Sequence, residues 1–179
     1  MEILYQTIGI IAMVSTIASW QGKNVKQILL FQGIGNILWT IHFLLLGSYA
    51  GAAMNGLSLI RCLGYYLIPN KKGKNIFTVL ISLSFIGLAI ITIIYFGEKW
   101  FIAVLLAIAT ITANIFYTIG NEKWCRLVQL SLVTPSWLFN NIWYMSIGGI
   151  ICELCTIVSV IVSLIRFRKK NPQNKEEIK

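Results

Sequence analysis

Residues 52–66 read AAMNGLSLIRCLGYY, an apolar stretch that nevertheless contains an asparagine, a serine and an arginine. Asn55, Ser58 and Arg61 recur at three-residue steps and therefore share one face of a helix. A charged side chain at the centre of a bilayer costs about 2.5–3.5 kcal/mol on insertion scales, so this stripe is expected to face protein or a cavity. We predict that Arg61 lies on a buried face; the alternative is a guanidinium that snorkels to the membrane surface.

The composition of the whole chain indicates an integral membrane protein. Of its 179 residues, 57% are hydrophobic and only 12% are charged, and the mean hydropathy is +0.76. A membrane-spanning helix needs about 20 mainly apolar residues, and the chain divides into segments of about that length. We therefore predict seven transmembrane helices, at residues 3–20, 28–46, 49–68, 76–95, 101–119, 127–145 and 150–165.

The basic residues predict the orientation of these helices. The lysines and arginines outside the helices lie in the loops after the first, third and fifth helices or near the C-terminus, whereas the other loops contain only Lys99. The positive-inside rule assigns the basic side to the cytoplasm, so the N-terminus is outside and the C-terminus inside. The net charge of +9 then reflects topology and attraction to anionic lipid rather than nucleic-acid binding. Residues 167–179 are predicted to form a basic, disordered cytosolic tail.

An internal repeat is indicated by matches between the two halves of the chain. A shift of 98 residues aligns Gly22 with Gly120, Trp39 with Trp137, Gly51 with Gly149, Asn55 with Glu153, and Ser58 with Thr156. We predict an all-α membrane protein in a 3+1+3 arrangement, in which two parallel three-helix repeats, 1–68 and 101–166, are joined by a linker helix, 76–95. In some transporters built from parallel repeats, the substrate site lies at the repeat interface near mid-membrane. The alternative is chance similarity between apolar segments.

Two longer segments resemble a known family. LLGSYAGAAMNGLSLIR (45–61) and PSWLFNNIWYMSIGGIICELCTIVSVIVSLIR (135–166) are similar to the YgjV family of bacterial inner-membrane proteins, and the similarity in length and spacing covers nearly the whole chain. This resemblance implies an inner-membrane location and no established function. The helix plan is also similar, more distantly, to SWEET sugar transporters and PnuC-type vitamin transporters. The proline-glutamine motif of the PQ-loop relatives is absent from the predicted helices, so no substrate class follows.

Three ionisable residues lie inside the predicted helices: His42, Arg61 and Glu153. His42 is about one turn below the outer end of the second helix, and Glu153 is at similar depth in the seventh. If the two meet across the repeat interface, each lowers the cost of burying the other's charge; the alternative places both, solvated and unpaired, in the headgroup region. We predict that Asn55, Arg61 and Glu153 face the interface between repeats, with His42 close to Glu153.

Amides and tryptophans in the second and sixth helices complete the candidate site. Gln32 and Asn36 lie on one helical face beside Trp39, and Pro135 frees a backbone carbonyl within the sixth helix. Aromatic faces surrounded by amides and hydroxyls suit a neutral polar ligand; the alternative is that they serve only helix packing. The predicted substrate-binding residues are Gln32, Asn36, Trp39, His42, Asn55, Ser58, Arg61, Trp137, Asn140, Asn141 and Glu153.

Several classes of function are not supported. The chain has no aspartate, no glycine-rich phosphate loop and one histidine, so phosphoryl transfer, a zinc hydrolase and a histidine-based triad are disfavoured. We predict no enzyme activity, no metal and no cofactor, and we interpret the lone C-x-x-C pair of Cys152 and Cys155 as packing. The expected partners are the lipid bilayer and a small polar solute; homo-oligomerisation stays open. The leading prediction is a transporter-like protein, and the alternative is a non-transporting scaffold or assembly partner.

Overall fold

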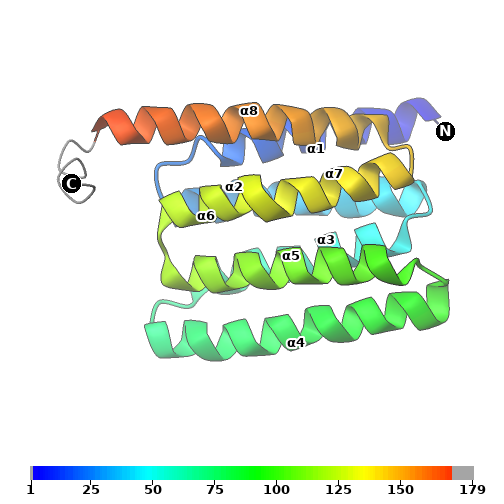
Figure 1. The fold of residues 1–179 in the computed structure, drawn as a ribbon, viewed down its shortest axis with the longest axis horizontal. Coiled ribbons are helices and arrows are strands. Elements are labelled where there is room, and N and C mark those ends of the chain that lie inside the picture. The colour runs from blue at the N-terminus through cyan, green and yellow to red at the C-terminus, as the bar shows by residue number, and fades with distance from the viewer. Residues whose placement is uncertain (1, 171–179) are drawn as a thin grey trace.

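The computed structural model describes the backbone of residues 2–170 and the side chains of residues 7–166. Within this part of the chain every regular element is a helix and none is a strand (Figure 1), which confirms the predicted all-α class. The elements are α1 (Glu2–Ser19), α2 (Val25–Leu45), α3 (Tyr49–Leu67), α4 (Lys71–Phe96), α5 (Trp100–Ile119), α6 (Glu122–Val128), the π-helical turn η1 (Gln129–Val133), α7 (Thr134–Trp143) and α8 (Ile147–Lys170).

Four helices are long and apolar enough to cross a membrane: α2, α4, α5 and residues Ile147–Arg166 of α8. The other three predicted spans are also helical, but their helices are shorter or less hydrophobic. In α3 the polar stripe and the glycines lower the hydropathy, and α1 contributes a shorter apolar stretch, Thr7–Ser19. The sixth predicted span is divided among α6, η1 and α7.

Two helices extend well beyond their predicted ends. α4 begins at Lys71 rather than at residue 76, because the side chain of Asn70 caps the helix by accepting a hydrogen bond from the N–H of Gly73. α8 continues to Lys170, so residues 167–170, predicted as part of the tail, are helical. The remainder of the predicted tail, 171–179, lies outside the described residues.

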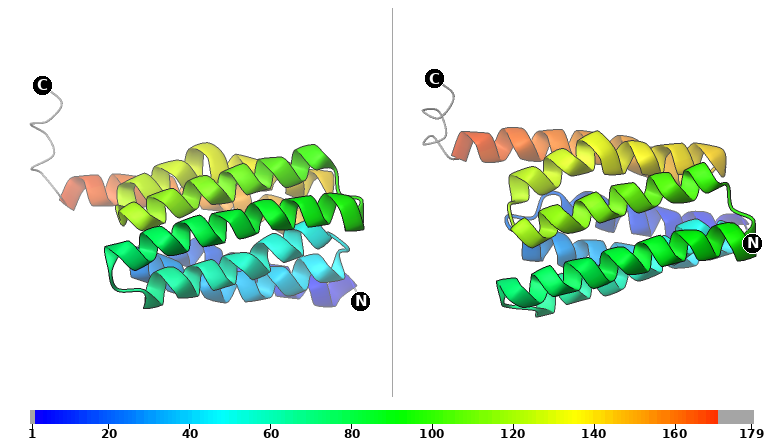
Figure 2. Two further views of the ribbon diagram at one scale, coloured as in Figure 1. Left: turned by 90° about the horizontal axis from the view of Figure 1, so that it is seen from below. Right: turned by 60° about the horizontal axis from the view of Figure 1, so that its bottom comes forward.

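With α6–η1–α7 counted as one helix, successive helices run in opposite directions in one bundle (Figures 1 and 2). α2 packs against α1 and α3, and the segment α6–η1–α7 packs against α5 and α8. α1 also contacts α8, α3 contacts α5, and α4 packs on the outside against α3 and α5. The loops α1–α2, α3–α4 and α5–α6 lie at the same end of the bundle as the C-terminal end of α8 (Figure 1). We call this the basic end, and the end with the N-terminus the opposite end.

The segment α6–η1–α7 is a helix interrupted by one π-helical turn. Asn121 caps α6 by accepting hydrogen bonds from the N–H groups of Lys123 and Trp124. A π-helical turn holds an extra residue compared with an α-helical turn and is common at functional sites. Pro135 follows directly, in the first turn of α7, so the helix is irregular where the missing N–H of proline was predicted to free a carbonyl.

The α2–α3 and α7–α8 corners have the same backbone hydrogen bonds. In each corner, N–H groups donate to carbonyls four and five residues earlier: Leu46 to His42 and Ser48 to Phe43 in the first, and Tyr144 to Asn140 and Ser146 to Asn141 in the second. Between these donors, Gly47 has a φ of 75° and Met145 a φ of 51°. Within the described chain, Met145 is the one residue other than glycine with a positive φ, a conformation that is unfavourable for a side chain with a Cβ.

Glu98 connects three elements at the opposite end. It lies in the α4–α5 loop and is 8% exposed. Its Oε1 accepts a hydrogen bond from the N–H of Ala50 in the first turn of α3, at 3.0 Å, where the helix dipole also favours a negative charge. Its Oε2 accepts a hydrogen bond from the phenol of Tyr144, which follows α7. Burial is the main cause that raises the pKa of Tyr144 above its ordinary value, and the nearby Glu98 carboxylate raises it further.

We expect the contact between Tyr144 and Glu98 to make the free energy of unfolding decrease at alkaline pH. A phenol with a raised pKa in the folded state contributes stability that is complete below the unfolded pKa of about 10 and is lost as pH rises through the folded pKa. Tyr144→Phe should therefore lower the free energy of unfolding by about 1.5 kcal/mol at pH 7, and the difference from the wild type should shrink above about pH 10. Thermal unfolding between neutral and alkaline pH measures this, with Tyr95→Phe, at a position 79% exposed, as control. A difference that does not change with pH would contradict the prediction.

Candidate functional site

A cavity of about 80 Å³ lies between the helices, with room for several water molecules. Side chains from α1, α2, α3, α5, η1, α7 and α8 reach it, and most of the predicted site residues are among them. The lining comprises Thr16, Trp20, Gln32, Asn36, Trp39, Phe43, Asn55, Ser58, Arg61, Thr110, Ala113, Tyr117, Gln129, Val133, Trp137, Asn141 and Glu153. Of the predicted site residues, His42 and Asn140 are buried but are not part of this lining.

Arg61 is held against the cavity wall by an aromatic ring. It is 7% exposed, and its guanidinium carbon lies 5.4 Å from the centroid of the Tyr117 ring on α5, a cation–π distance. The phenol of Tyr117 donates to Oε1 of Gln32 on α2 at 2.8 Å. The Nε atom of Arg61 is buried with no hydrogen-bond partner among the described residues. The predicted buried face is therefore confirmed, and snorkelling to the membrane surface is not observed.

Glu153 and Asn55 line the same cavity from α8 and α3. The amide nitrogen of Asn55 donates to the carbonyl of Gly51 in its own helix at 2.8 Å. Oε2 of Glu153 is buried and, in the described part of the chain, has no hydrogen-bond partner. The two residues paired by the sequence shift thus line one cavity from different helices, and their position at an interface between repeats stays a prediction.

A row of three aromatic rings crosses the cavity wall. Trp39 stacks on Phe43 with ring centroids 5.6 Å apart, and Phe43 stacks on Trp137 at 5.9 Å. The indole N–H of Trp39 donates to Oγ1 of Thr16 on α1 at 3.0 Å. The two predicted tryptophans are therefore joined through Phe43, which was not among the predicted site residues.

The proximity of His42 to Glu153 stays a prediction, but His42 is not part of the cavity lining that includes Glu153. His42 is 1% exposed, and its Nε2 lies 3.3 Å from Oγ of Ser146 in the α7–α8 corner. Its ring also packs so closely on α1 that a Cβ added at Gly9 would be 3.0 Å from it. The depth of the two residues was similar, but His42 points towards α1 and the corner, whereas Glu153 points into the cavity. The solvated headgroup alternative is excluded by the same burial.

Sequence reasoning missed several lining residues. Tyr117 follows Thr110 and Asn114 on one buried face of α5, a polar stripe that was not considered, and Trp20 directly follows α1. Gln129 lies on η1, where the π-helical turn changes the side-chain direction; its amide donates to Oγ1 of Thr134 at 3.0 Å. A signal for Gln129 does exist, because it follows Gln32 by 97 positions, next to the shift of 98 that was considered.

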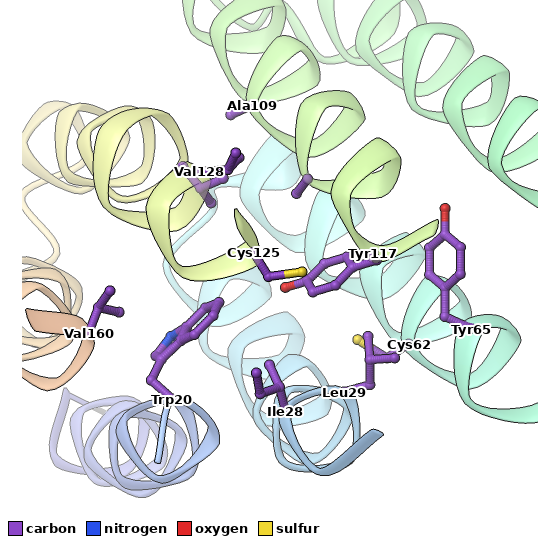
Figure 3. Close-up of a cluster of buried hydrophobic side chains, with 12 residues drawn as sticks. Trp20, Ile28, Leu29, Cys62, Tyr65, Ala109, Tyr117, Cys125, Val128 and Val160 are labelled. Atoms are coloured by element: carbon purple, nitrogen blue, oxygen red, sulfur yellow. The ribbon is translucent and has the colours of Figure 1, made fainter. Parts of the chain in front are cut away.

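Apolar clusters pack on both sides of the cavity. Towards the basic end, Trp20, Ile28, Leu29 and Tyr65 belong to a cluster that also contains Val160 (Figure 3). Towards the opposite end, a second cluster comprises Ala12, Trp39, Phe43, Ala52 and Cys152. Burying Cys152 there agrees with its interpretation as a packing residue, and the four cysteines are free.

Long apolar helices around a small polar cavity define a polytopic membrane protein. The chain belongs to the Imp-YgjV family, described as bacterial inner membrane proteins, whose family model matches residues 3–171. The predicted family and inner-membrane location are thus confirmed. No curated protein and no solved structure matches the chain. Within the described residues, no group of three or more His, Cys, Asp or Glu side chains is placed to hold a metal ion.

Proposed function

We propose that the protein is transporter-like and carries a small polar solute in the central cavity. The observation that carries this proposal is a pair of ionisable side chains in that cavity, each with one buried atom that has no hydrogen-bond partner among the described residues: Nε of Arg61 and Oε2 of Glu153. Buried polar groups that serve packing alone are normally hydrogen-bonded, whereas a binding site leaves groups for the ligand. Apolar clusters close the cavity towards both ends of the bundle. They support a site that opens to one side of the membrane at a time, when the helices at that end rearrange.

We further propose seven spans, with α6–η1–α7 counted as one. The alternating helix directions and the loops of the basic end support this topology (Figure 1). By the positive-inside rule the basic end faces the cytoplasm. The N-terminus would then be outside the membrane and the C-terminus in the cytoplasm.

The helices α1–α3 and α5–α8 are proposed to be parallel repeats, with α4 as the linker. The strongest support is the α2–α3 and α7–α8 corners, whose hydrogen bonds and left-handed residues Gly47 and Met145 are equivalent at a shift of 98. The contacts α1–α8 and α3–α5 also match, because a two-fold axis along the membrane normal exchanges them.

A one-residue change in the shift agrees with the same proposal. The pairs are Asn24 with Asn121 and Gln32 with Gln129 at a shift of 97, and Trp39 with Trp137 at a shift of 98. Asn24 and Asn121 both cap the helix that follows. The second unit therefore contains one extra residue between Gln129 and Trp137, and η1 accommodates it within the helix.

Comparison of metabolites in cells with and without the protein tests the proposed function. We expect at least one small polar solute to change several-fold in cellular level, and its radiolabelled form to enter proteoliposomes that contain the purified protein. Empty liposomes are the control. Equal metabolite levels with no uptake would instead favour the scaffold or assembly partner, whose polar residues serve helix packing.

A further inference from the structure

We propose that the solute is a small zwitterion, with a carboxylate bound by Arg61 and an ammonium group bound by Glu153. This inference rests on the proposed function and names the chemical class of the solute. It replaces the neutral polar ligand expected from the sequence, because the structure places both ionisable side chains in the lining of one cavity.

Arg61 lacks a counter-ion among the side chains that the structure describes. Its guanidinium stays charged in proteins, and among residues 7–166 no acidic side chain forms an ion pair with it. Tyr117 covers the guanidinium by a cation–π contact, which leaves the charge unneutralised. The planar donor fork of arginine matches a carboxylate, so a ligand carboxylate would supply the missing negative charge.

Glu153 offers the complementary group from another helix. It approaches the cavity from α8, whereas Arg61 approaches from α3. No ion pair joins these two described side chains, and Oε2 of Glu153 and Nε of Arg61 each lack a hydrogen-bond partner among the described residues. A guanidinium and a carboxyl group that line one cavity without pairing can each bind one end of a ligand that carries both charges. A buried carboxylate is most strongly stabilised by a cationic donor.

The remaining walls fit a solute of a few carbon atoms. The stacked rings of Trp39, Phe43 and Trp137 provide an apolar surface. A volume of about 80 Å³ suits a compact molecule rather than a nucleoside or a disaccharide. L-Alanine has the charges, the size and one apolar methyl group.

Binding of three matched probes to the purified full-length protein in lipid nanodiscs tests the proposal. L-Alanine carries both charges, L-lactate only the carboxylate, and L-alaninol only the ammonium group. We expect alanine to bind at least tenfold more tightly than either of the others, as measured by calorimetry. Glu153→Gln should reduce alanine binding to the level of lactate without weakening lactate, and Arg61→Gln should abolish the binding of both. Arg166→Gln, at an exposed position, is the control variant.

The wild-type comparison is decisive even if a variant does not fold. Equal binding of the three probes, or binding of none, would overturn the zwitterion. A preference for alanine that persists in folded Glu153→Gln would also overturn it. If the probes fail but a metabolite difference and uptake are found, transport stands without this substrate class; if uptake is absent as well, both proposals fail.

Discussion

Replacing Gly149 with alanine is expected to lower the free energy of unfolding by about 1–3 kcal/mol, the range for overpacking a well-packed interior. A Cβ at this position in α8 would lie 2.4 Å from Oδ1 and 2.5 Å from Cγ of Asn141, far inside van der Waals contact. Asn141 is 2% exposed and lines the cavity. Its amide must therefore shift within a crowded site, and the helix α8 must move if the amide does not.

Two further variants separate this clash from a general effect of removing glycine. Gly87 lies in α4, and a Cβ there has no atom within 4 Å, so Gly87→Ala should leave stability unchanged or raise it slightly. Asn141→Ala removes the obstruction, so Gly149→Ala should cost much less when combined with it than alone. The measurement is unfolding of the detergent-solubilised wild type, the three single variants and the Asn141→Ala/Gly149→Ala double variant. A Gly149→Ala variant as stable as the wild type would show that the helices do not pack this closely.

The helices were predictable because apolar segments of spanning length leave few alternatives in a membrane. Hydropathy locates the part of a helix that crosses lipid but not the end of the helix itself. Asn70 caps α4, so the helix includes a stretch of lysines. A prediction from charge alone assigns these lysines to a loop. α3 shows the converse, since Arg61 and the glycines lower the hydropathy of a helix that the packing still buries.

The candidate site was predictable where polar residues repeat with helical spacing. Asn55, Ser58 and Arg61 share a face, and the structure places all three on one cavity. Spacing fixes which residues share a face only while the helix is regular, so η1 concealed Gln129. Counting residues along the helix likewise predicts how deep His42 lies in the membrane. It does not predict in which direction around the helix axis the side chain points.

The backbone of the two corners and the backbone of the first loop bear differently on the proposed repeat. Gly47 and Met145 adopt the same left-handed conformation although their side chains differ. Gly22 and Gly120 are identical, yet only Gly120 has a positive φ, of 74°. Residue identity and backbone conformation therefore do not coincide here, because different residues can adopt the same φ and identical residues can differ in φ.

Arg61→Gln is expected to reduce uptake of the transported solute about 100-fold. Truncating one partner of a buried, hydrogen-bonded charge pair costs about 2–5 kcal/mol, and about 2.8 kcal/mol corresponds to 100-fold. Glutamine retains hydrogen-bonding capacity but loses the charge and the contact with the Tyr117 ring. The measurement is initial uptake into proteoliposomes of the solute found by metabolite comparison.

Arg61→Lys distinguishes the charge from the shape of the guanidinium. Lysine keeps the positive charge but lacks the planar donor fork and stacks less well on an aromatic ring, so its uptake should lie between those of the wild type and Arg61→Gln. Arg166→Gln removes a charge at an exposed position and should transport normally. Thermal unfolding shows whether each variant is folded. Wild-type uptake by folded Arg61→Gln would remove Arg61 from the site, because a buried charge that contacts the solute cannot be deleted without weakening binding.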